Sequence, residues 1–151
     1  MMIPVLTTKR LILRLPEAAD LDGWAAFSAD PETMAYLGGV QSRAESWRAL
    51  CTMRGAWDIR GFAMFSVIER DTGRWVGRIG PWQPEGWPGR EVGWGVAREF
   101  AGRGYAHEAA SAAMDYPAAS VNRLPLPERC SKTRRFYCSM SQRVRWTMPP
   151  K

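Results

Sequence analysis

Histidine and cysteine are scarce in this chain. Its 151 residues include one histidine, His107, and three cysteines, and no two cysteines form a C-x-x-C pair. A standard zinc site needs four Cys or His ligands at short spacings, so the sequence predicts no metal site. An odd number of cysteines favours reduced thiols over a disulfide framework.

Long apolar runs are also missing. No uncharged stretch approaches the roughly 20 residues that a membrane-spanning helix needs. The N-terminal sequence MMIPVLTTKRLILRL carries Lys9 and Arg10 where a signal peptide would be apolar. We therefore expect a cytoplasmic protein without a membrane partner. With 46% hydrophobic and 24% charged residues, the composition is typical of one folded domain and argues against disorder or a coiled coil.

Excess positive charge is confined to the C-terminal part of the chain. The net charge of +6 would by itself suggest a polyanionic partner. The first 116 residues carry 13 Lys and Arg against 14 Asp and Glu, whereas residues 117–151 carry eight Lys and Arg against one acid. Five of the eleven prolines also lie in residues 117–151. The sequence predicts a domain over residues 1–116, followed by an atypical basic segment that is not a separate domain.

The start of the domain predicts one strand and two helices. Apolar residues alternate over residues 8–15, as they do in a half-buried strand, and Leu11 and Leu13 share one face. Residues 18–28 have apolar side chains at helical spacing. Pro31 is suited to the first position of a second, short helix that ends at the two glycines before residue 40.

A third helix is expected over residues 42–57. Ser42 and Glu45 have the spacing of a capping box, which satisfies backbone N–H groups at a helix start. Gly61 is expected to close the helical region. The residues expected to form its buried stripe are Trp47, Leu50, Cys51 and Trp57.

Three strands follow the helices. Residues 62–69 are aromatic and β-branched, residues 71–73 supply turn chemistry, and residues 75–80 predict the returning strand of a hairpin. Residues 81–89 contain three prolines and two glycines and predict a loop. Residues 91–96 then predict a further strand.

A glycine-bearing loop connects this strand to a helix that ends at Tyr116. Gly102 and Gly104 remove side chains that would block a ligand, and Ala106 keeps the first helical turn slim. Backbone N–H groups at such a helix start favour a phosphate or pyrophosphate. A Walker A loop would need Lys and Ser or Thr after its glycines, and a dinucleotide fingerprint would follow the first strand. The alternative is a connection that only caps the helix.

The order of elements and several sequence stretches resemble the GNAT superfamily of acetyl-CoA-dependent N-acetyltransferases. These stretches include TKRLILRLPEAADLDGW, DPE, ERDTGRWVGRIG and EVGWGVAREFAGRGYAHEAA. The resemblance covers residues 7–116 and is greatest to the ribosomal-protein N-terminal acetyltransferase-like subgroup. The family's phosphate motif, Gln/Arg-x-x-Gly-x-Gly/Ala, is met with Ala101 in the Gln/Arg place and with Gly104 and Ala106 at the small positions.

The resemblance implies a fold and a co-substrate. The implied fold is α+β, with a mixed, mostly antiparallel sheet, flanking helices and a bulge in the strand at residues 91–96, where Gly93 and Gly95 suit it. The implied co-substrate is acetyl-CoA. The residues implied to bind it are Gly95 and Val96 along pantetheine, and Ala101, Gly102, Arg103, Gly104, Tyr105 and Ala106 at the pyrophosphate. Arg98 and Arg103 add positive charge there or form a solvated surface.

The implied reaction is acetyl transfer to a primary amine, either a small molecule or a peptide N-terminus. Glu91 lies where members of the subgroup often keep a carboxylate that takes the amine proton. The alternative for Glu91 is a solvated strand end. His107 is expected to be exposed or to touch a phosphate rather than to act as the base.

The chain departs from the family after residue 116. The family's fifth strand, further helix and last strands are not recognisable, and Pro117 breaks the helix. We interpret the abrupt change as a shifted reading frame or a recombined gene end, or else as a hairpin around residues 136–148. With these elements replaced, we expect weak acetyl transfer and self-association through the exposed edge of strand 91–96. Two alternatives stay open: an inactive acyl-CoA-binding remnant, and nucleic-acid binding through the basic segment.

Overall fold

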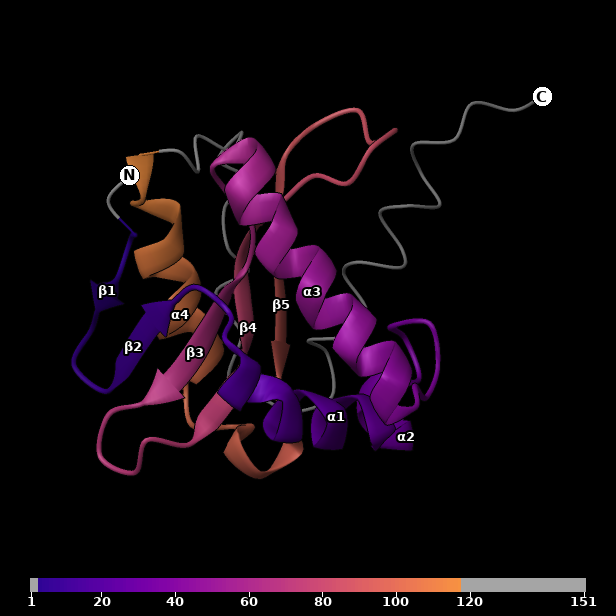
Figure 1. Ribbon diagram of the computed structural model, residues 1–151. Coiled ribbons are helices and arrows are strands. Elements are labelled where there is room, and N and C mark those ends of the chain that lie inside the picture. The colour runs from indigo at the N-terminus through magenta and orange to yellow at the C-terminus, as the bar shows by residue number, and fades with distance from the viewer. Residues whose placement is uncertain (1–2, 118–151) are drawn as a thin grey trace.

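The computed structural model describes residues 3–117 (Figure 1). In chain order its elements are β1 (Leu6–Thr7), β2 (Leu11–Arg14), the 3-10 turn η1 (Ala18–Asp20), α1 (Leu21–Ala29), α2 (Pro31–Met34), α3 (Arg43–Arg60), β3 (Phe65–Glu69), β4 (Trp75–Trp82), β5 (Glu91–Val96), the 3-10 turn η2 (Arg98–Phe100) and α4 (Tyr105–Met114). None of the described helices is long and apolar enough to cross a membrane. The basic segment and its hairpin at residues 136–148 lie outside the described residues.

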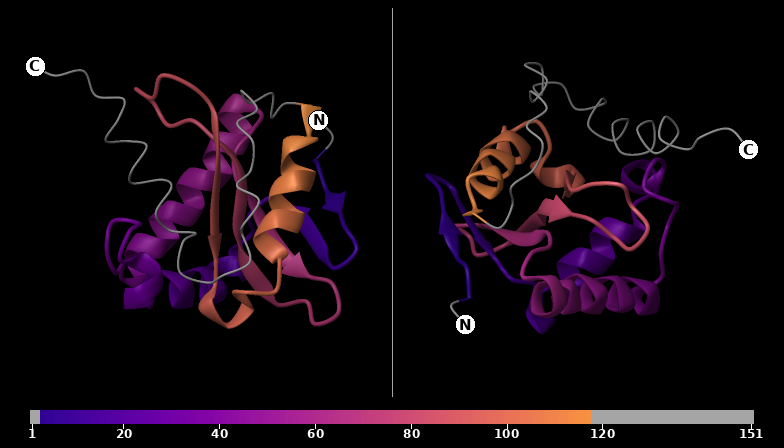
Figure 2. Two further views of the ribbon diagram at one scale, coloured as in Figure 1. Left: turned by 180° about the vertical axis from the view of Figure 1, so that it is seen from behind. Right: turned by 90° about the horizontal axis from the view of Figure 1, so that it is seen from above.

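The five strands form one sheet in the order β1-β2-β3-β4-β5. Each strand pairs with its neighbour in the antiparallel sense. Figure 2 shows α3 and α4 on opposite sides of this sheet. The α+β class with flanking helices is therefore confirmed, and the described part of the sheet is antiparallel throughout. The self-association expected through β5 stays a prediction.

The predicted strand at residues 8–15 is shorter in the structure, where β2 covers Leu11–Arg14 and follows a short strand, β1, that was not predicted. β1 and β2 form a small hairpin in which Leu6 pairs with Leu13. Thr8 makes the turn, because its N–H donates to the Leu11 carbonyl at 2.9 Å and its hydroxyl accepts the Leu11 N–H at 3.0 Å. These local bonds compete with a continuous strand. The alternation was predicted correctly, since Leu11 and Leu13 are both 0% exposed.

The ends of α3 confirm the predicted signals. The Ser42 side chain accepts the Glu45 N–H, and the Glu45 carboxylate accepts the Ser42 N–H at 2.7 Å, which completes the capping box. Gly61 ends the helix with φ at +74°, a left-handed conformation that glycine adopts easily. The helix runs three residues beyond the predicted end at Trp57.

The stripe predicted for α3 is half correct, since Leu50 and Trp57 are buried as predicted. Trp47 is 55% exposed and Cys51 is exposed, whereas the buried positions are Ser46, Leu50, Met53 and Trp57. These four positions follow the spacing i, i+4, i+7 and i+11 of one helical face. Ser46 is small and polar, so the sequence gave no sign that it is buried. The large apolar Trp47 beside it indicated a buried position but is exposed.

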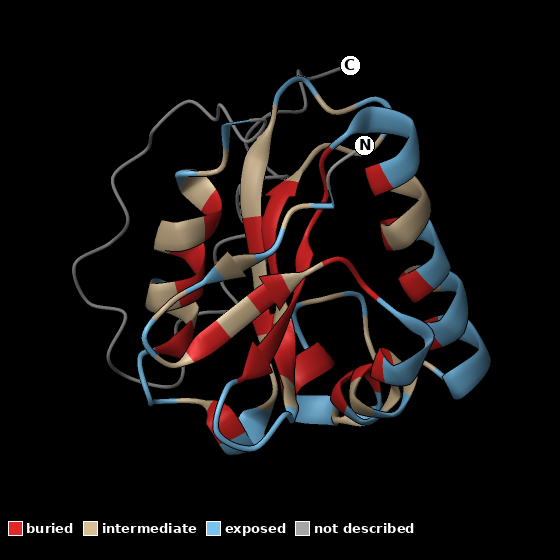
Figure 3. Ribbon diagram, turned by 60° about the vertical axis from the view of Figure 1, so that its left-hand side comes forward, coloured by how far each residue is buried: buried red, intermediate tan, exposed pale blue. Residues whose placement is uncertain are grey.

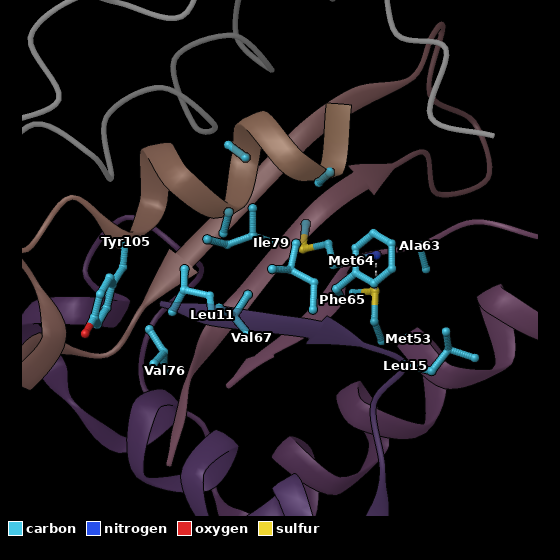
Figure 4. Close-up of a cluster of buried hydrophobic side chains, with 14 of the residues drawn as sticks. Leu11, Leu15, Met53, Ala63, Met64, Phe65, Val67, Val76, Ile79 and Tyr105 are labelled. Carbon is cyan, nitrogen blue, oxygen red and sulfur yellow. Dashed lines mark hydrogen bonds between the residues drawn. The ribbon is translucent and has the colours of Figure 1, made fainter. Parts of the chain in front are cut away.

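One apolar core joins the sheet to the helices. Figure 3 shows the buried residues on the strands and on the sheet-facing sides of α3 and α4. Figure 4 shows part of the cluster, with labelled side chains from β2, β3, β4, α3 and the start of α4. Its members include Leu11, Val67 and Ile79, each 0% exposed, and Ala109 of α4, also 0% exposed. Small alanines on α4 therefore let this helix lie close to the sheet.

Two glycines permit the close packing of β4, β5 and α1. A Cβ at Gly77 would lie 2.1 Å from the Gly95 carbonyl oxygen, and a Cβ at Gly95 would lie 2.6 Å from the Phe27 ring. The ladder from Gly77–Val96 to Trp82–Glu91 is unbroken. A bulge predicted for β5 is therefore not present on its β4 side.

The sheet differs from the prediction at two further points. The register shift in the described sheet lies between β3 and β4, at Val67 and Ile68. β4 also extends to Trp82, so Pro81, predicted to open a loop, pairs with Val92 inside the sheet.

We expect the substitution Gly77→Ala to destabilise the domain by roughly 1–3 kcal/mol, because the new methyl group meets a backbone carbonyl that cannot turn away. Gly55→Ala is the control, since a Cβ at Gly55 meets nothing within 4 Å. Inside α3 this alanine should stabilise by about 0.5–1 kcal/mol. Urea unfolding followed by circular dichroism measures both. Equal effects of the two alanines would contradict the packing described for β4 and β5.

Candidate functional site

The loop between β5 and α4 is anchored at its start. The Ala97 N–H donates to the Val76 carbonyl at 2.8 Å, directly after the β4–β5 ladder ends. Phe100 of η2 is 1% exposed, and its N–H donates to the Ala97 carbonyl at 2.9 Å. These contacts fix the position of the glycine-bearing residues that follow.

Two left-handed glycines shape the end of this loop. The backbone φ is +78° at Gly102 and +79° at Gly104, a region that other residues rarely adopt. Gly104 is the N-cap of α4 and has no side chain with which to cap the helix. The first N–H groups of α4 therefore lack an intrahelical acceptor, and the positive end of the helix dipole lies beside them. Such a helix start can hold a phosphate group.

Ala101 contributes to the loop differently from what was predicted. Its N–H donates to the Arg98 carbonyl at 3.1 Å and closes η2. This N–H already has an acceptor within the loop, because the preceding residues form a 3-10 turn, which no local glycine or proline announced. A role for Ala101 at the pyrophosphate stays a prediction from the resemblance.

Arg10 and Glu108 clamp the start of α4 to the β1–β2 hairpin. The Arg10 guanidinium donates to the Glu108 carboxylate at 2.7 Å, and the Arg10 backbone N–H donates to the same carboxylate at 2.9 Å. The Thr8 hydroxyl adds a third donor at 2.7 Å. Arg10 also donates to the Arg103 carbonyl at 2.9 Å. This last contact fixes the peptide plane between Arg103 and Gly104 and turns its N–H away from Arg10.

The clamp changes the acidity of Glu108. Burial raises the pKa of this carboxyl, but the hydrogen bonds from Thr8 and Arg10 outweigh burial. The pKa of Glu108 therefore lies below its usual value of 4.5. The carboxylate form is the one that stabilises the folded state.

Tyr105 directs its side chain into the protein. It is 7% exposed, and its hydroxyl donates to the Glu69 carboxylate at 2.5 Å. This hydrogen bond raises the pKa of Tyr105 and lowers the pKa of Glu69. Arg10 lies over the Tyr105 ring at 4.5 Å. Only the backbone of Tyr105 faces the loop, so any ligand contact must come from its N–H.

The two arginines of the loop differ. Arg103 is half exposed and lies 3.6 Å from Glu69, so its charge is only partly matched. Arg98 forms two hydrogen bonds with Asp30, at 2.8 and 3.0 Å, and an ion pair with Glu32 at 2.7 Å. Arg98 therefore ties the loop to the α1–α2 corner, and its charge is already balanced there.

Gly95, Val96 and Glu91 lie along β5, which is the outermost strand of the described sheet. Gly95 pairs with Arg78, and Val96 pairs with Gly77. Glu91 begins the strand, is half buried and pairs with Trp82. The structure thus places Glu91 at one end of β5 and the glycine loop at the other.

Two further predictions concern His107 and metal ions. His107 is exposed on the first turn of α4, as expected. Within residues 3–117 there is no group of three or more His, Cys, Asp or Glu side chains that could hold a metal ion.

Sequence reasoning missed the clamp around Glu108. Thr8 and Arg10 lie 100 and 98 residues from Glu108. No spacing rule connects residues so far apart, and a lone glutamate in a helix is usually solvated. The available signal was that both partners lie in the stretches TKRLILRL and HEAA, which carry the resemblance.

A family model described as "Acetyltransferase (GNAT) domain" matches residues 10–141. This match runs past residue 116, where the resemblance was predicted to end. The described residues stop at 117, so that boundary stays a prediction.

Individual proteins show the same likeness. The chain is 31% identical over 120 residues to the "Uncharacterized N-acetyltransferase p20" of Bacillus licheniformis, with 78% of this chain and 67% of that protein covered. It is 33% identical to a solved acetyltransferase of Agrobacterium tumefaciens, with a TM-score of 0.68 and coverage of 77% and 67%. A ribosomal L7/L12 α-N-protein acetyltransferase shares the fold at 15% identity and a TM-score of 0.61, with 78% and 66% covered. The chain spans about two thirds of the length of the curated relatives that it matches, 66% and 67%.

The substitution Glu108→Gln should lower the stability of the domain by about 1–2 kcal/mol at neutral pH, because it removes the charge that three donors share. The lowered pKa means that this stabilisation is complete above pH 4.5 and is lost as the pH falls through the pKa of the folded state. The variant should therefore lose less stability on acidification than the parent.

Glu85→Gln is the matched control, because the Glu85 side chain is 95% exposed in its ion pair with Arg60. Urea unfolding at several pH values between about 3 and 7 measures all three proteins. If Glu108→Gln followed the parent's pH dependence, the clamp would not contribute as described.

Proposed function

Because the chain belongs to the acetyltransferase (GNAT) domain family, we propose that it transfers the acetyl group of acetyl-CoA to a primary amine. The observation that carries this proposal is the loop before α4, where two left-handed glycines lead into a helix whose N-cap residue, Gly104, has no capping side chain. The thioester supplies an activated acetyl group when it is bound. The protein must hold it, orient the amine and accept a proton.

The residues of this loop fit the pyrophosphate of CoA. The glycines leave the backbone open, the first turn of α4 has N–H groups to donate, and Arg103 adds a half-exposed positive charge. Arg10 supports the fit indirectly, because it holds the Arg103 carbonyl. We propose that the N–H groups of Gly102, Arg103, Gly104, Tyr105 and Ala106 receive the phosphate oxygens. Ala101 is left out of this set.

We propose that the pantetheine arm runs along β5 and that Gly95 and Val96 bond to it through their backbone. The support is positional. β5 is the last strand of the described sheet, and its C-terminal end leads directly into the loop. A pantetheine arm that starts at the loop and extends along β5 toward Glu91 would place its free end near the middle of the strand.

We propose Glu91 as the group that takes the proton of the attacking amine, directly or through water. An amine attacks a thioester only in its neutral form, so a nearby carboxylate helps by removing the proton as the new bond forms. Two features of Glu91 support this role. It is half buried, and it lies on the same strand as the backbone groups proposed to bind pantetheine.

The acceptor is a small amine or a peptide N-terminus. The ribosomal-protein N-terminal acetyltransferase-like subgroup is the proposed place of this chain within the family, and it rests on the sequence stretches described above. A cytoplasmic location stays an expectation from the sequence.

The substitution Gly104→Val should weaken CoA binding at least ~5-fold, about 1 kcal/mol. A branched side chain disfavours the φ of +79° and stands where the phosphate would approach. Gly61→Val is the matched control, since Gly61 has φ at +74° at the far end of α3. It brings the same backbone strain without touching the loop. Calorimetric titration with CoA measures the affinity of the parent and of both variants. Equal affinity in the parent and the Gly104 variant would refute the loop assignment.

The substitution Glu91→Gln should lower kcat for acetyl transfer roughly 100-fold near neutral pH and leave CoA affinity unchanged. The assay follows thiol release from acetyl-CoA with a panel of amines and N-terminal peptides. Glu85→Gln serves as the control, because its carboxylate lies in solvent on the loop before β5. A Glu91→Gln protein with the parent's pH–rate profile would assign the proton to another group.

A further inference from the structure

Arg78 of β4 lies on the sheet face that α1 covers. It pairs with Gly95 of β5 and with Ser66 of β3, so these residues share a face. Its guanidinium carbon lies 5.3 Å from the Trp24 ring centre and 5.8 Å from the Phe27 ring centre, and both rings belong to α1. The side chain is thus held against two aromatic rings and keeps part of its surface open to solvent.

Among residues 3–117 no carboxylate bonds to this guanidinium. No side-chain hydrogen bond or ion pair of Arg78 occurs in this part of the chain, and burial, the sole influence on its pKa, lowers that pKa to about 10. Arg14 shows the usual alternative on the same face, because it forms two hydrogen bonds with Asp20 at 2.8 and 2.9 Å. Arg78 therefore stays protonated at neutral pH, and the described residues supply no counter-charge for it.

An unmatched charge removed from water is unfavourable for folding. Burial penalises the charged form of the guanidinium, and contacts with the two aromatic rings return only part of that penalty. A leucine or methionine would cover the same rings without this cost. The guanidinium at this position is therefore suited to a negatively charged group that arrives from outside the domain.

The same face of the sheet leads from Arg78 to the candidate base. The pairs Arg78–Gly95 and Trp82–Glu91 lie on one face, four residues apart along the strands. At about 3.4 Å per residue, Glu91 and Gly95 are roughly 14 Å apart along β5. Between them on this face lies the pair Gly80–Gly93, which carries no side chains.

We propose that Arg78 binds a carboxylate of the acetyl acceptor, so that the preferred acceptors are amines with a carboxylate a few bonds away, such as a peptide with an acidic residue next to its N-terminus. This inference rests on the proposed function, because it assumes that the amine reacts beside Glu91. The guanidinium presents a planar fork that matches a carboxylate with two parallel hydrogen bonds.

The cofactor phosphates are a less suitable partner for Arg78. The loop before α4 lies beyond the C-terminal end of β5, and α4 covers the opposite face of the sheet (Figure 2). A cofactor held there would keep its phosphates on the α4 side, whereas Arg78 contacts α1.

The test compares two peptide amides, Ala-Asp-Ala-Ala and Ala-Asn-Ala-Ala, which differ only in one carboxylate. Their affinities are measured by calorimetry with and without CoA, and their kcat/KM by thiol release. The parent should prefer the acidic peptide by about 10-fold or more, since a hydrogen bond to a charged group contributes about 1.5–3 kcal/mol. Arg78→Met, which keeps an apolar stem over Trp24 and Phe27, should bring this ratio close to one. Arg78→Lys should retain part of it.

Arg43→Met is the matched control, because Arg43 forms an exposed ion pair with Asp22 and should keep the parent's ratio. CoA affinity, measured for every variant, verifies folding. A parent that binds the two peptides equally or binds neither, or an Arg78→Met protein that keeps the preference, overturns the proposal. So does an Arg78→Met protein that changes only the KM for acetyl-CoA. Loss of CoA binding in the parent would instead refute the proposed function, and the peptide ratio without CoA would still report on Arg78.

Discussion

The carboxylate of Glu108 is the contact on which the arrangement of the site depends. It receives donors from Thr8 and Arg10 and so joins the first turn of α4 to the β1–β2 hairpin. Through Arg10 the same network reaches the Arg103 carbonyl in the glycine loop. A helix start can serve as an anion site only if its N–H groups hold a fixed direction. In this protein that direction is fixed by Thr8 and Arg10, which lie near the N-terminal end of the described residues.

The absence of side chains at a few positions is the second constraint. Gly77 and Gly95 let β4, β5 and the Phe27 ring approach closely, and Gly102 and Gly104 give the loop its left-handed turns. The first pair sets how α1 lies on the sheet, and the second opens the backbone before α4. Glycine is therefore used for two different physical reasons within one short region of the molecule, close packing and positive φ.

The two faces of β4 and β5 divide the proposed work between them. α4 and the glycine loop belong to one side, with Tyr105 and Glu69 bonded beneath the loop. α1 belongs to the other, where Arg78 lies against aromatic rings and finds no counter-charge among residues 3–117. Such a division would let the proposed cofactor and acceptor approach the same strand from different directions. Within the described residues the Arg98 side chain is ion-paired and the Arg78 side chain is not, and this contrast favours Arg78 as the arginine that meets a ligand.

The sequence by itself determined the order of helices and strands from β2 to α4, the α3 capping box, the antiparallel hairpin of β3 and β4, and the glycine loop before α4. All of these depend on residues within a few positions of one another, so local propensity and spacing suffice. Only the tertiary structure decided which face of α3 is buried, that the Ala101 N–H is used within the loop, and that Glu108 meets Arg10. These features depend on contacts between distant segments, and their energies come from burial and from charges brought together by folding. No periodicity in the chain records such contacts.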